Sequence, residues 1–475
     1  MNLATEQTSP QPEGMTPNPQ GGLSKKLFSI LVIGVSLIGV IYSMQTSNMG
    51  LALFSLLFLL LLLGTPIAIA LGVSSFLSIY YFTTDPLPDL AGKVFSGLNS
   101  FPLMAIPFFV LAGNIFTSGG VAKRLIHLTN MWVGHIPGGL SIASIVSCTL
   151  FAAISGSSPA TVVAIGGIMI PAMVDHGYDK NYAVGSVSTA GSLGILIPPS
   201  IPMIVYAVTV EQSVGKLFLA GIVPGILLMT LLSLVSFFIA RKRNYAKAEK
   251  ASINDRLKAF KRAIWSLGLP IVVVGGIYSG VFTPTESAAV AVVLGVVVGL
   301  WIHKDLRFKD FPEILLNSAK TTAMLFFIIA MAMTFAHILT LERIPHSIAE
   351  LITGWNMGPI MFLLIVNILL FIAGQFMEPT AIITILAPIL FPVAMGVGID
   401  PIHFGIVMVV NMEVGMITPP VGLNLYVASG ITKMPLVDVT KSALPWLVAV
   451  VIGLILVTYI PAISLWLPEF LYGFR

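Results

Sequence analysis

The chain has 475 residues, of which 56% are hydrophobic and only 9% charged, and its formal net charge is +4. A soluble domain carries roughly 25% charged residues, so this composition excludes a soluble globular protein and indicates a helical membrane protein with many spans. The single cysteine, Cys148, excludes a disulfide framework and a cysteine-based metal site, and we expect it to be a small packed residue.

The N-terminal segment differs from the rest of the chain. Residues 1–24 are rich in Pro, Gln, Thr and Gly and predict a disordered cytoplasmic tail. Residues 25–48 begin with Lys25 and Lys26 and continue as an apolar run with no cleavage pattern after it. They predict an additional, uncleaved transmembrane helix whose N-terminus lies in the cytoplasm.

The following residues divide into apolar runs close to the roughly 20 residues that cross a bilayer. Alternating these runs across the membrane places all but four of the 24 Lys and Arg residues on the cytoplasmic side, as the positive-inside rule requires. The largest group of cations lies in a predicted basic cytoplasmic loop at residues 241–263, and the C-terminus is predicted to be periplasmic. The predicted spans are residues 27–44, 49–63, 65–82, 101–118, 180–209, 217–240, 264–281, 285–302, 319–340, 402–430 and 444–467.

Two long apolar regions, residues 139–174 and 358–395, do not fit this alternation as simple crossings. Each reads as two arms of about 15 residues around a small polar turn, and an arm of that length covers only roughly 22 Å of a core about 30 Å thick. A re-entrant hairpin therefore fits each region better than two crossings.

The chain also contains an internal repeat, because residues 165–207 align without gaps with residues 386–428. With the hairpins included, residues 49–240 and 264–468 contain the same order of elements from opposite starting sides. This predicts two inverted repeats, an architecture of secondary transporters. The residues that coincide are Pro171/Pro392, Gly177/Gly398, Asp179/Asp400, Gly194/Gly415, Pro198/Pro419 and Pro199/Pro420.

A double proline interrupts each of the predicted helices at 180–209 and 402–430. Proline lacks an N–H group and displaces the carbonyl four residues before it, so each helix is expected to unwind. Bare carbonyl oxygens suit a hard cation, and the new helix N-terminus suits an anion. The alternative is that the prolines merely kink the helices. The carbonyls expected to be released are those of Gly194, Ile195, Gly415 and Met416.

Small polar residues gather at the turns of the predicted hairpins. "SGSSP" (155–159) would face "STAGSLG" (188–194), and "AGQFMEPT" (373–380) would face "NMEVGMITPP" (411–420). Each pair could form a small site lined by neutral oxygens, which suits Na⁺ in size and hardness. The alternative is that these Ser and Thr residues only let helices pack closely.

On these residues the sequence resembles the large membrane subunit of the tripartite ATP-independent periplasmic (TRAP) transporters, over about residues 49–468. The resemblance implies an elevator-type fold, in which the hairpins and broken helices move against a scaffold, and Na⁺-coupled import of organic acids with two or more Na⁺ sites. The blocks that carry the resemblance are "GTPIAIALG", "AIPFFVLAGNIF", "SGSSPATVVAIGGIMIPAM", "GSLGILIPPSIPMIVYA", "AGIVPG", "FTPTESAAVAV" and "GIDPIHFGIVMVVNMEVGMITPPVGLNLYVASGI".

The resemblance also implies two partners, a small membrane subunit of about four helices and a soluble periplasmic binding protein that delivers the substrate. The first 48 residues depart from the family's usual start and are too short for a fused small subunit, so we expect a separate partner chain. The blocks "SGSSPATV" and "NMEVGMITPPVG" resemble the C4-dicarboxylate branch more than the sialic-acid branch.

Carried onto this sequence, the resemblance implies two Na⁺ sites and an anionic substrate between the hairpin tips. No Lys or Arg lies in these motifs, so either helix dipoles, hydroxyls and bound Na⁺ recognise the carboxylate or selectivity lies mainly in the binding protein. The first Na⁺ site is expected at Ser155, Gly156, Ser157, Ser158, Ser192 and Gly194, the second at Gly374, Thr380, Asn411, Gly415 and Thr418, and the substrate at Ser158, Pro159, Thr161, Pro199, Pro379 and Asn424.

Three acidic residues in the membrane runs have separate expectations. Glu286 stands at a predicted helix start and is expected to cap it. Glu378 and Glu413 lie beside the predicted Na⁺ sites, where an isolated charge costs about 3 kcal/mol, so each either pairs with a cation or is protonated and structural. The histidines show no metal-ligand spacing and are expected to be interface residues: His127, His135, His337 and His403.

The sequence lacks the motifs of other functional classes. The chain has no G-x-S-x-G or H-E-x-x-H motif for a hydrolase, and no G-x-x-x-x-G-K-[ST] loop for a primary pump. Paired pockets with hairpin gates favour alternating occlusion over a channel. The sequence therefore predicts a multi-pass transporter of the bacterial inner membrane and not an enzyme. The nearest alternative is a stand-alone Na⁺/carboxylate symporter of related fold, which would need no binding protein.

Overall fold

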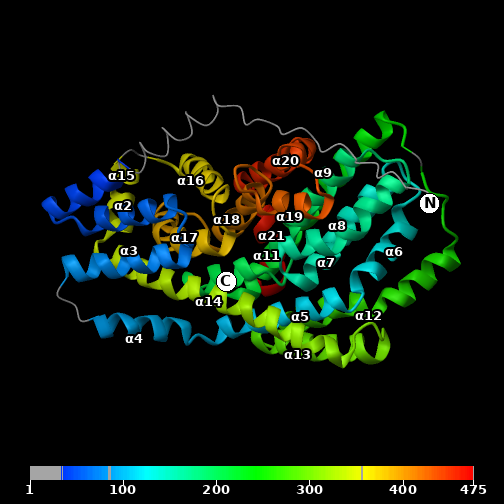
Figure 1. Ribbon diagram of the computed structural model, residues 1–475, viewed down its shortest axis with the longest axis horizontal. Coiled ribbons are helices and arrows are strands. Elements are labelled where there is room, and N and C mark those ends of the chain that lie inside the picture. Colours follow the sequence, from blue (N-terminus) through cyan, green and yellow to red (C-terminus); the bar gives the residue numbers. More distant parts are fainter. Residues whose placement is uncertain (1–33, 35, 84–86, 246, 355–356, 474–475) are drawn as a thin grey trace, which may run out of the picture. The chain divides into compact units, whose positions relative to one another are not determined.

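The computed structural model describes residues 34, 36–83, 87–245, 247–354 and 357–473 (Figure 1). Every regular element in these ranges is a helix, which confirms the predicted all-α fold. Eight helical stretches among the described residues are long and apolar enough to cross a membrane. They are residues 101–118, 158–175, 214–242, 253–278, 284–302, 308–341, 379–396 and 436–459.

The chain forms two compact units, the first ending at residue 85 and the second beginning at residue 86. In the first unit, residues 36–46 are helical, and α2 (Met49–Leu62) packs against α3 (Ile67–Phe82). The predicted tail at residues 1–24 lies outside the described residues. Residues 25–33 and 35 of the predicted helix at 25–48 lie outside them as well. The sequence pattern does not predict the boundary after residue 85, which falls inside the first predicted repeat.

The second unit contains all the elements that form the candidate site. In its first half they are α4 (Leu87–Leu98), η1 (Phe101–Met104), α5 (Ala105–Ser118), α6 (Val121–Val133), α7 (Gly139–Ser155), α8 (Ser158–Asp175), α9 (Lys180–Ala190), η2 (Gly191–Ile195), α10 (Ile201–Thr209) and α11 (Val214–Lys242). In its second half they are α12 (Ile253–Tyr278), α13 (Pro284–Val297), η3 (Val298–Ile302), η4 (Phe308–Asp310), α14 (Phe311–Leu341), α15 (Ile344–Gly354), α16 (Pro359–Gly374), α17 (Pro379–Gly396), α18 (Pro401–Met416), α19 (Leu423–Thr432), α20 (Leu436–Tyr459) and α21 (Ala462–Tyr472).

Helix pairs occupy both regions that were expected to form hairpins. Helix α7 packs against α8, and α16 packs against α17. Each pair is followed by an interrupted helix, made of α9, η2 and α10 in the first half and of α18 and α19 in the second. A cis peptide bond lies in each interruption, at Pro198–Pro199 and at Pro419–Pro420. The second arms, α8 and α17, have 18 residues each and are therefore longer than expected.

The repeated Gly and Asp residues determine where the interrupted helices begin. Gly177 and Gly398 both have φ of +81°, a conformation that favours glycine just after a helix end. Two residues later, the carboxylate of Asp179 accepts a first-turn N–H of α9 at 3.1 Å, and Asp400 does the same for α18 at 3.0 Å. A helix stop and a helix start are thus encoded together in each half.

The segment before each interruption lies in the interior of the second unit. All residues from Tyr182 to Ala190 and from Ile402 to Met416 are buried. Helix α9 approaches α20 so closely that a Cβ atom on Gly185 would lie 2.1 Å from the Ser442 carbonyl oxygen. The residue Ser236 of α11 joins these helices, because its carbonyl accepts a hydrogen bond from the Tyr182 hydroxyl at 2.8 Å and its hydroxyl accepts one from the Trp446 indole at 2.8 Å.

Several expectations for single side chains are confirmed. Cys148 is fully buried in α7. His403 joins helices, since its ring bonds the Ser464 hydroxyl at 2.7 Å and the Thr458 carbonyl at 3.2 Å. Glu286 forms a capping box with Thr283 at the start of α13: the Thr283 hydroxyl accepts the Glu286 N–H at 3.2 Å, and the Glu286 carboxylate accepts the Thr283 N–H at 2.8 Å.

The basic segment at 241–263 differs from the loop that was expected. Helix α12 already begins at Ile253, so the second part of this segment is helical. The hydroxyl of Ser252 accepts the N–H of Asp255 at 3.2 Å and caps the helix. Ala259 and Ala263, one turn apart, then pack against Leu128 of α6. Charge patterning predicts that this segment lies outside the membrane but does not exclude a helix there.

Candidate functional site

The first hairpin tip joins α7 to α8 through residues that were predicted to bind Na⁺. Helix α7 ends at Ser155, Gly156 has φ of +58°, and Ser157 precedes the first residue of α8. The Ser155 and Thr161 hydroxyls lie 3.1 Å apart, and the Thr161 hydroxyl donates to the Ser157 carbonyl at 2.8 Å. The tip is thus held by its own hydroxyl groups.

This tip lies directly against the interruption between α9 and α10, as the sequence predicted. A Cβ atom on Gly194 would lie 2.7 Å from the Ser157 carbonyl oxygen, and one on Gly156 would lie 2.6 Å from the Pro199 carbonyl oxygen. Real Cβ atoms do not approach backbone so closely. Glycine is therefore required on both sides of the contact, and backbone carbonyl oxygens of the two segments lie close together.

The expectation of bare carbonyl groups at the interruptions is wrong for two of the four. The Ser200 hydroxyl donates to the Ile195 carbonyl, and the N–H of Thr418 donates to the Gly415 carbonyl at 3.2 Å. The reason is local, since Ser200 lies just beyond the double proline and also caps α10 by accepting the Met203 N–H at 3.3 Å. A polar residue next to a helix break satisfies the groups that the break releases.

The second tip repeats the close approach between hairpin and interrupted helix. A Cβ atom on Gly415 would lie 2.7 Å from the backbone of Gly374. Just beyond the double proline, the N–H of Val421 donates to the Gln375 carbonyl at 3.0 Å. Hairpin α16–α17 is therefore bonded to the interruption between α18 and α19 by backbone contacts, without a side chain between them.

The other residues predicted for the second Na⁺ site have different partners. The Asn411 amide donates to the backbone carbonyl of Asn367 at 3.0 Å and to its side-chain oxygen at 2.8 Å, in the middle of α16. The Thr418 hydroxyl donates to the Val414 carbonyl at 2.6 Å, within the same turn of chain. The Thr380 hydroxyl donates to the carboxylate of Glu378, the residue just before α17. The structure thus brings Gly374 and Gly415 together, and the Asn411 side-chain oxygen is buried with no hydrogen-bond partner among the described residues, so the grouping of all five residues around one cation stays a prediction.

One contact joins the two halves among the residues predicted for the substrate. The Ser158 hydroxyl donates to the Asn424 side-chain oxygen at 2.8 Å, and the Asn424 amide donates to the Ser188 carbonyl at 3.2 Å. Both side chains are fully buried. Pro159, Thr161 and Pro199 belong to the same tip and interruption as Ser158, whereas Pro379 begins α17 in the other hairpin. The sequence did not identify Ser188 as a bonding partner, although it lies in the segment predicted to face the tip.

A second contact between the halves involves Ser192 and Glu413. The Ser192 hydroxyl donates to one Glu413 carboxyl oxygen at 3.4 Å, and the two residues are 221 positions apart, as are Pro198 and Pro419. They are therefore equivalent positions of the repeat that meet each other. The second Glu413 oxygen has no hydrogen-bond partner among the described residues, although the side chain is fully buried. The repeat alignment could have predicted this pair, because residues near a twofold axis contact their own equivalents.

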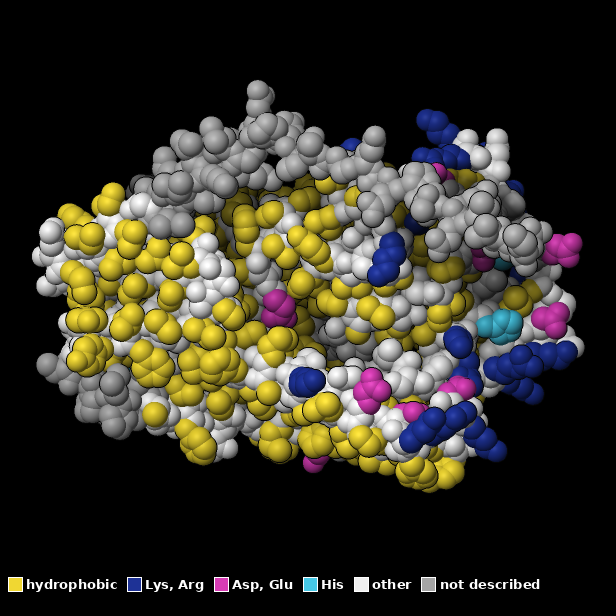
Figure 2. Space-filling model, viewed as in Figure 1, with side chains coloured by type: hydrophobic (Ala, Val, Ile, Leu, Met, Phe, Trp, Pro, Cys, Tyr) yellow, Lys and Arg dark blue, Asp and Glu magenta, His cyan; other side chains and the backbone are white. Residues whose placement is uncertain are grey.

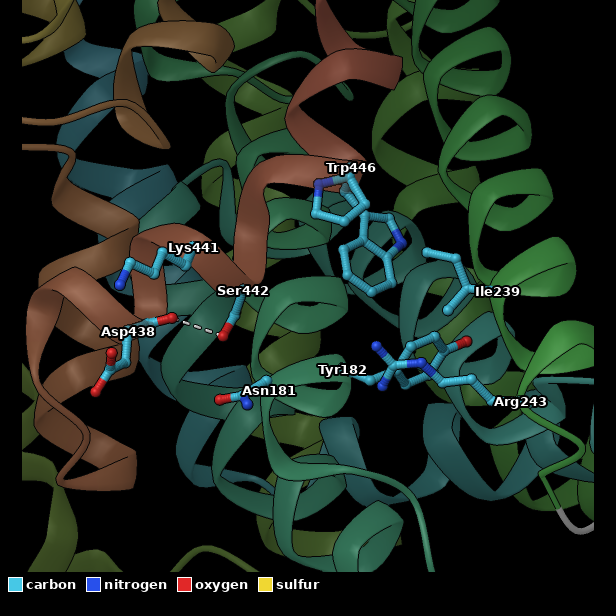
Figure 3. A pocket seen from close by; sticks show the side chains of 9 residues that line it. Asn181, Tyr182, Ile239, Arg243, Asp438, Lys441, Ser442 and Trp446 are labelled. Carbon is cyan, nitrogen blue, oxygen red and sulfur yellow. Dashed lines mark hydrogen bonds between the residues drawn. The ribbon is translucent and has the colours of Figure 1, made fainter.

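A cavity elsewhere in the second unit lies between α9, α11 and α20 (Figure 3). Its volume is about 470 Å³, and it contains none of the predicted site residues. Of its two cations, Arg243 and Lys441, Arg243 already has partners: the Tyr245 hydroxyl at 3.1 Å, which raises the pKa of Arg243, and the Asp179 carboxylate at 3.6 Å. This cavity is therefore separate from the candidate site.

In chemical terms, the first tip and its interruption offer largely buried hydroxyl and backbone carbonyl oxygens, and the second tip offers backbone carbonyl oxygens beside the exposed Pro419 and Pro420. No Lys or Arg lies in the sequence of these segments. Such neutral oxygens suit a small hard cation. The start of α8 at Ser158 and that of α10 at Ile201 lie at the same tip, and helix N-termini stabilise anions. The site thus has groups for a cation and for an anion within one contact region.

We predict that Gly415→Ala strongly destabilises the protein, because the added methyl group would overlap the Gly374 backbone; such overpacking typically costs about 1–3 kcal/mol. Gly396→Ala is the matched control, since a Cβ atom there would meet nothing within 4 Å. The measurement is the melting temperature of each variant in the same detergent. Equal melting temperatures for the two variants would contradict the close backbone contact.

We predict that Glu413→Gln leaves transport and its Na⁺ dependence within about twofold of the parent. A buried carboxyl group whose one partner among the described residues is a serine hydroxyl is more stable protonated than charged in the membrane interior. The amide then replaces a neutral group of the same shape. The measurement is the half-saturating Na⁺ concentration; a rise of tenfold, about 1.4 kcal/mol, would show instead that the carboxylate binds a cation.

Comparison with known proteins identifies the family of this chain. A family model described as "Tripartite ATP-independent periplasmic transporter, DctM component" matches residues 54–463. The chain is 55% identical to the C4-dicarboxylate TRAP transporter large permease protein DctM of Pseudomonas aeruginosa, over 85% of this chain and 94% of that protein. It is 50% identical to the protein of the same name from Rhodobacter capsulatus, over 89% of this chain and 99% of that protein. The crystal structure of the Alcanivorax borkumensis YdaH transporter has a similar fold, with a TM-score of 0.57 and 16% identity over 81% of this chain and 88% of that chain. The chain therefore belongs to the DctM component family of the tripartite ATP-independent periplasmic transporters.

Proposed function

We propose that this permease subunit imports small organic acids, with C4-dicarboxylates favoured, by symport with Na⁺ across the bacterial inner membrane. The observation that carries the substrate class is the high identity to the two relatives named as C4-dicarboxylate permeases. Family membership makes the chain a transporter subunit rather than an enzyme.

The geometry of the tips supports coupling to a monovalent cation. The first tip gathers Ser155, Ser157 and Thr161 around buried backbone, and no Lys or Arg lies in these motifs. A dicarboxylate at this place would then meet helix N-termini and hydroxyl groups, while bound Na⁺ would offset its charge. The contact between Ser158 and Asn424 connects the two halves where such a substrate would bind.

The same contacts support an elevator mechanism. Each hairpin is joined to its interrupted helix by backbone contacts, and the halves are joined to each other through Ser158–Asn424 and Ser192–Glu413. We propose that these elements move as one body. The small membrane subunit and the periplasmic binding protein are the partners that the family implies, and the distribution of Lys and Arg supports a cytoplasmic N-terminus and a periplasmic C-terminus.

The experiment is uptake of labelled succinate into proteoliposomes that contain this chain and the small subunit. Four conditions combine the presence or absence of an inward Na⁺ gradient with that of the binding protein. We predict uptake only when both are present. Uptake that needs Na⁺ but no binding protein would support the stand-alone symporter instead, and uptake indifferent to Na⁺ would contradict the assignment of Na⁺ sites.

Within that assay we predict that Ser158→Ala lowers uptake by about tenfold, the equivalent of about 1.4 kcal/mol for a lost buried hydrogen bond to Asn424. Ser233→Ala is the matched control, because the Ser233 hydroxyl only bonds the Met229 carbonyl of its own helix. Equal uptake by both variants, at equal protein levels, would remove Ser158 from the proposed substrate site.

A further inference from the structure

A second cavity of about 600 Å³, here called the basic cavity, lies apart from the candidate site. It is formed by α6, by the first part of α12 and by the chain that follows η3. Figure 2 shows Lys and Arg side chains gathered toward the end of the drawn face where α6 and α12 lie. The cavity is lined by Lys123, Arg124, His127, Lys261, Arg262, Trp265, Ile302, His303 and Asp305.

The walls of the basic cavity are held together by packing beneath it. Leu128 of α6 packs against Ala259 and Ala263 of α12 in a small buried cluster. On the other side, Arg124 forms an ion pair with Asp305 at 2.5 Å, which attaches the chain after η3 to α6. The cavity is therefore defined by three segments in fixed contact and not by one mobile loop.

The charge of the basic cavity is strongly unbalanced. Four Lys and Arg side chains face one carboxylate, and that carboxylate, Asp305, already pairs with Arg124. Within the described part of the chain, Lys123, Lys261 and Arg262 form no ion pair. Burial, and after it the neighbouring Arg124, lowers the pKa of His303. Like charges that line one cavity repel each other, so an anion that enters the cavity lowers the electrostatic energy.

The residues at the basic cavity have the pattern of a membrane boundary. Trp265 lies three residues after Arg262, precedes the apolar stretch of α12 and is 52% exposed. Ile302, at the end of the apolar stretch of α13 and η3, is also exposed. Tryptophan is typical of the boundary between headgroups and hydrocarbon, so charged and apolar walls meet at one opening.

From this placement we propose that the basic cavity binds the phosphate headgroup of an anionic phospholipid of the inner leaflet, such as cardiolipin or phosphatidylglycerol. Basic pockets between transmembrane helices on the cytoplasmic side suit such headgroups. A soluble phosphate has the same charge but gains nothing from the exposed Trp265 and Ile302, so the apolar wall favours the lipid. The proposal does not rest on the transport function and can be tested without it.

The test is lipid titration of the full-length protein in detergent, followed by native mass spectrometry. Cardiolipin, phosphatidylglycerol and phosphatidylcholine are compared for the parent and for Lys261→Gln/Arg262→Gln. The matched control is Arg241→Gln/Lys242→Gln, which removes the same two charges from the exposed end of α11 outside the cavity. A second variant, Lys123→Gln on α6, reports on the cavity even if the double variant does not fold.

We expect the parent to bind cardiolipin and phosphatidylglycerol more tightly than phosphatidylcholine. The double change at 261 and 262 should weaken cardiolipin binding about 30-fold, since each cation contributes about 1 kcal/mol. Lys123→Gln should also weaken cardiolipin binding, and the control at 241 and 242 should bind cardiolipin as tightly as the parent. Equal losses in both double variants would overturn the proposal, because they would show a general effect of surface charge.

A further arm adds inorganic phosphate at millimolar concentration to the cardiolipin complex. We expect the lipid to remain bound. Displacement by phosphate alone would overturn the lipid assignment and indicate a site for a soluble phosphate compound. Binding of all three lipids with equal strength would overturn it as well.

Discussion

The central physical constraint of this protein is that irregular backbone inside a membrane must be covered by protein or satisfied by hydrogen bonds. Two helices of the second unit are interrupted by a double proline, and the segments before the interruptions, residues 182–190 and 402–416, are buried, whereas Pro419 and Pro420 are exposed. The cover comes from the hairpin tips, which touch the interruptions backbone to backbone at Gly194 and at Gly415. A side chain at either glycine would separate tip from interruption and expose the carbonyl groups between them.

The two halves are joined by side-chain hydrogen bonds close to the interruptions. Ser192 meets its own repeat equivalent, Glu413, and Ser158 of one half bonds Asn424 of the other. The interrupted helices are therefore connected to each other and to the tips. A transporter that moves these elements together keeps the oxygen-lined contacts intact while they face first one side of the membrane and then the other. The proposed elevator mechanism fits these contacts for that reason.

Much of this arrangement could be predicted from the residues, because the signals are local. The helix stops at Gly177 and Gly398 and the starts at Asp179 and Asp400 are capping signals that appear in the structure as such. The contact between each tip and its interruption could be predicted because short polar segments occur at matching places in the two repeats.

Other features could not be predicted because the partners are distant in sequence or because a neighbour satisfies the group. The Ser200 hydroxyl donates to the Ile195 carbonyl, which the missing proline N–H groups alone would leave without a partner. The Asn411 amide donates to Asn367 in the middle of α16, while the Asn411 side-chain oxygen is buried and has no partner among the described residues, so its place in a Na⁺ site stays a prediction. The helical start of α12 at Ile253 depends on packing of Ala259 against α6, which charge patterning does not report.

The most direct test of the account is hydrogen–deuterium exchange of the protein in Na⁺ and in K⁺ at equal ionic strength. If Na⁺ binds where tip and interruption meet, Na⁺ will slow exchange at 155–158 and 191–200 and at 374–380 and 415–422, while the start of α12 will be unchanged. Identical exchange in the two salts at all four segments would contradict the assignment of Na⁺ to these contacts.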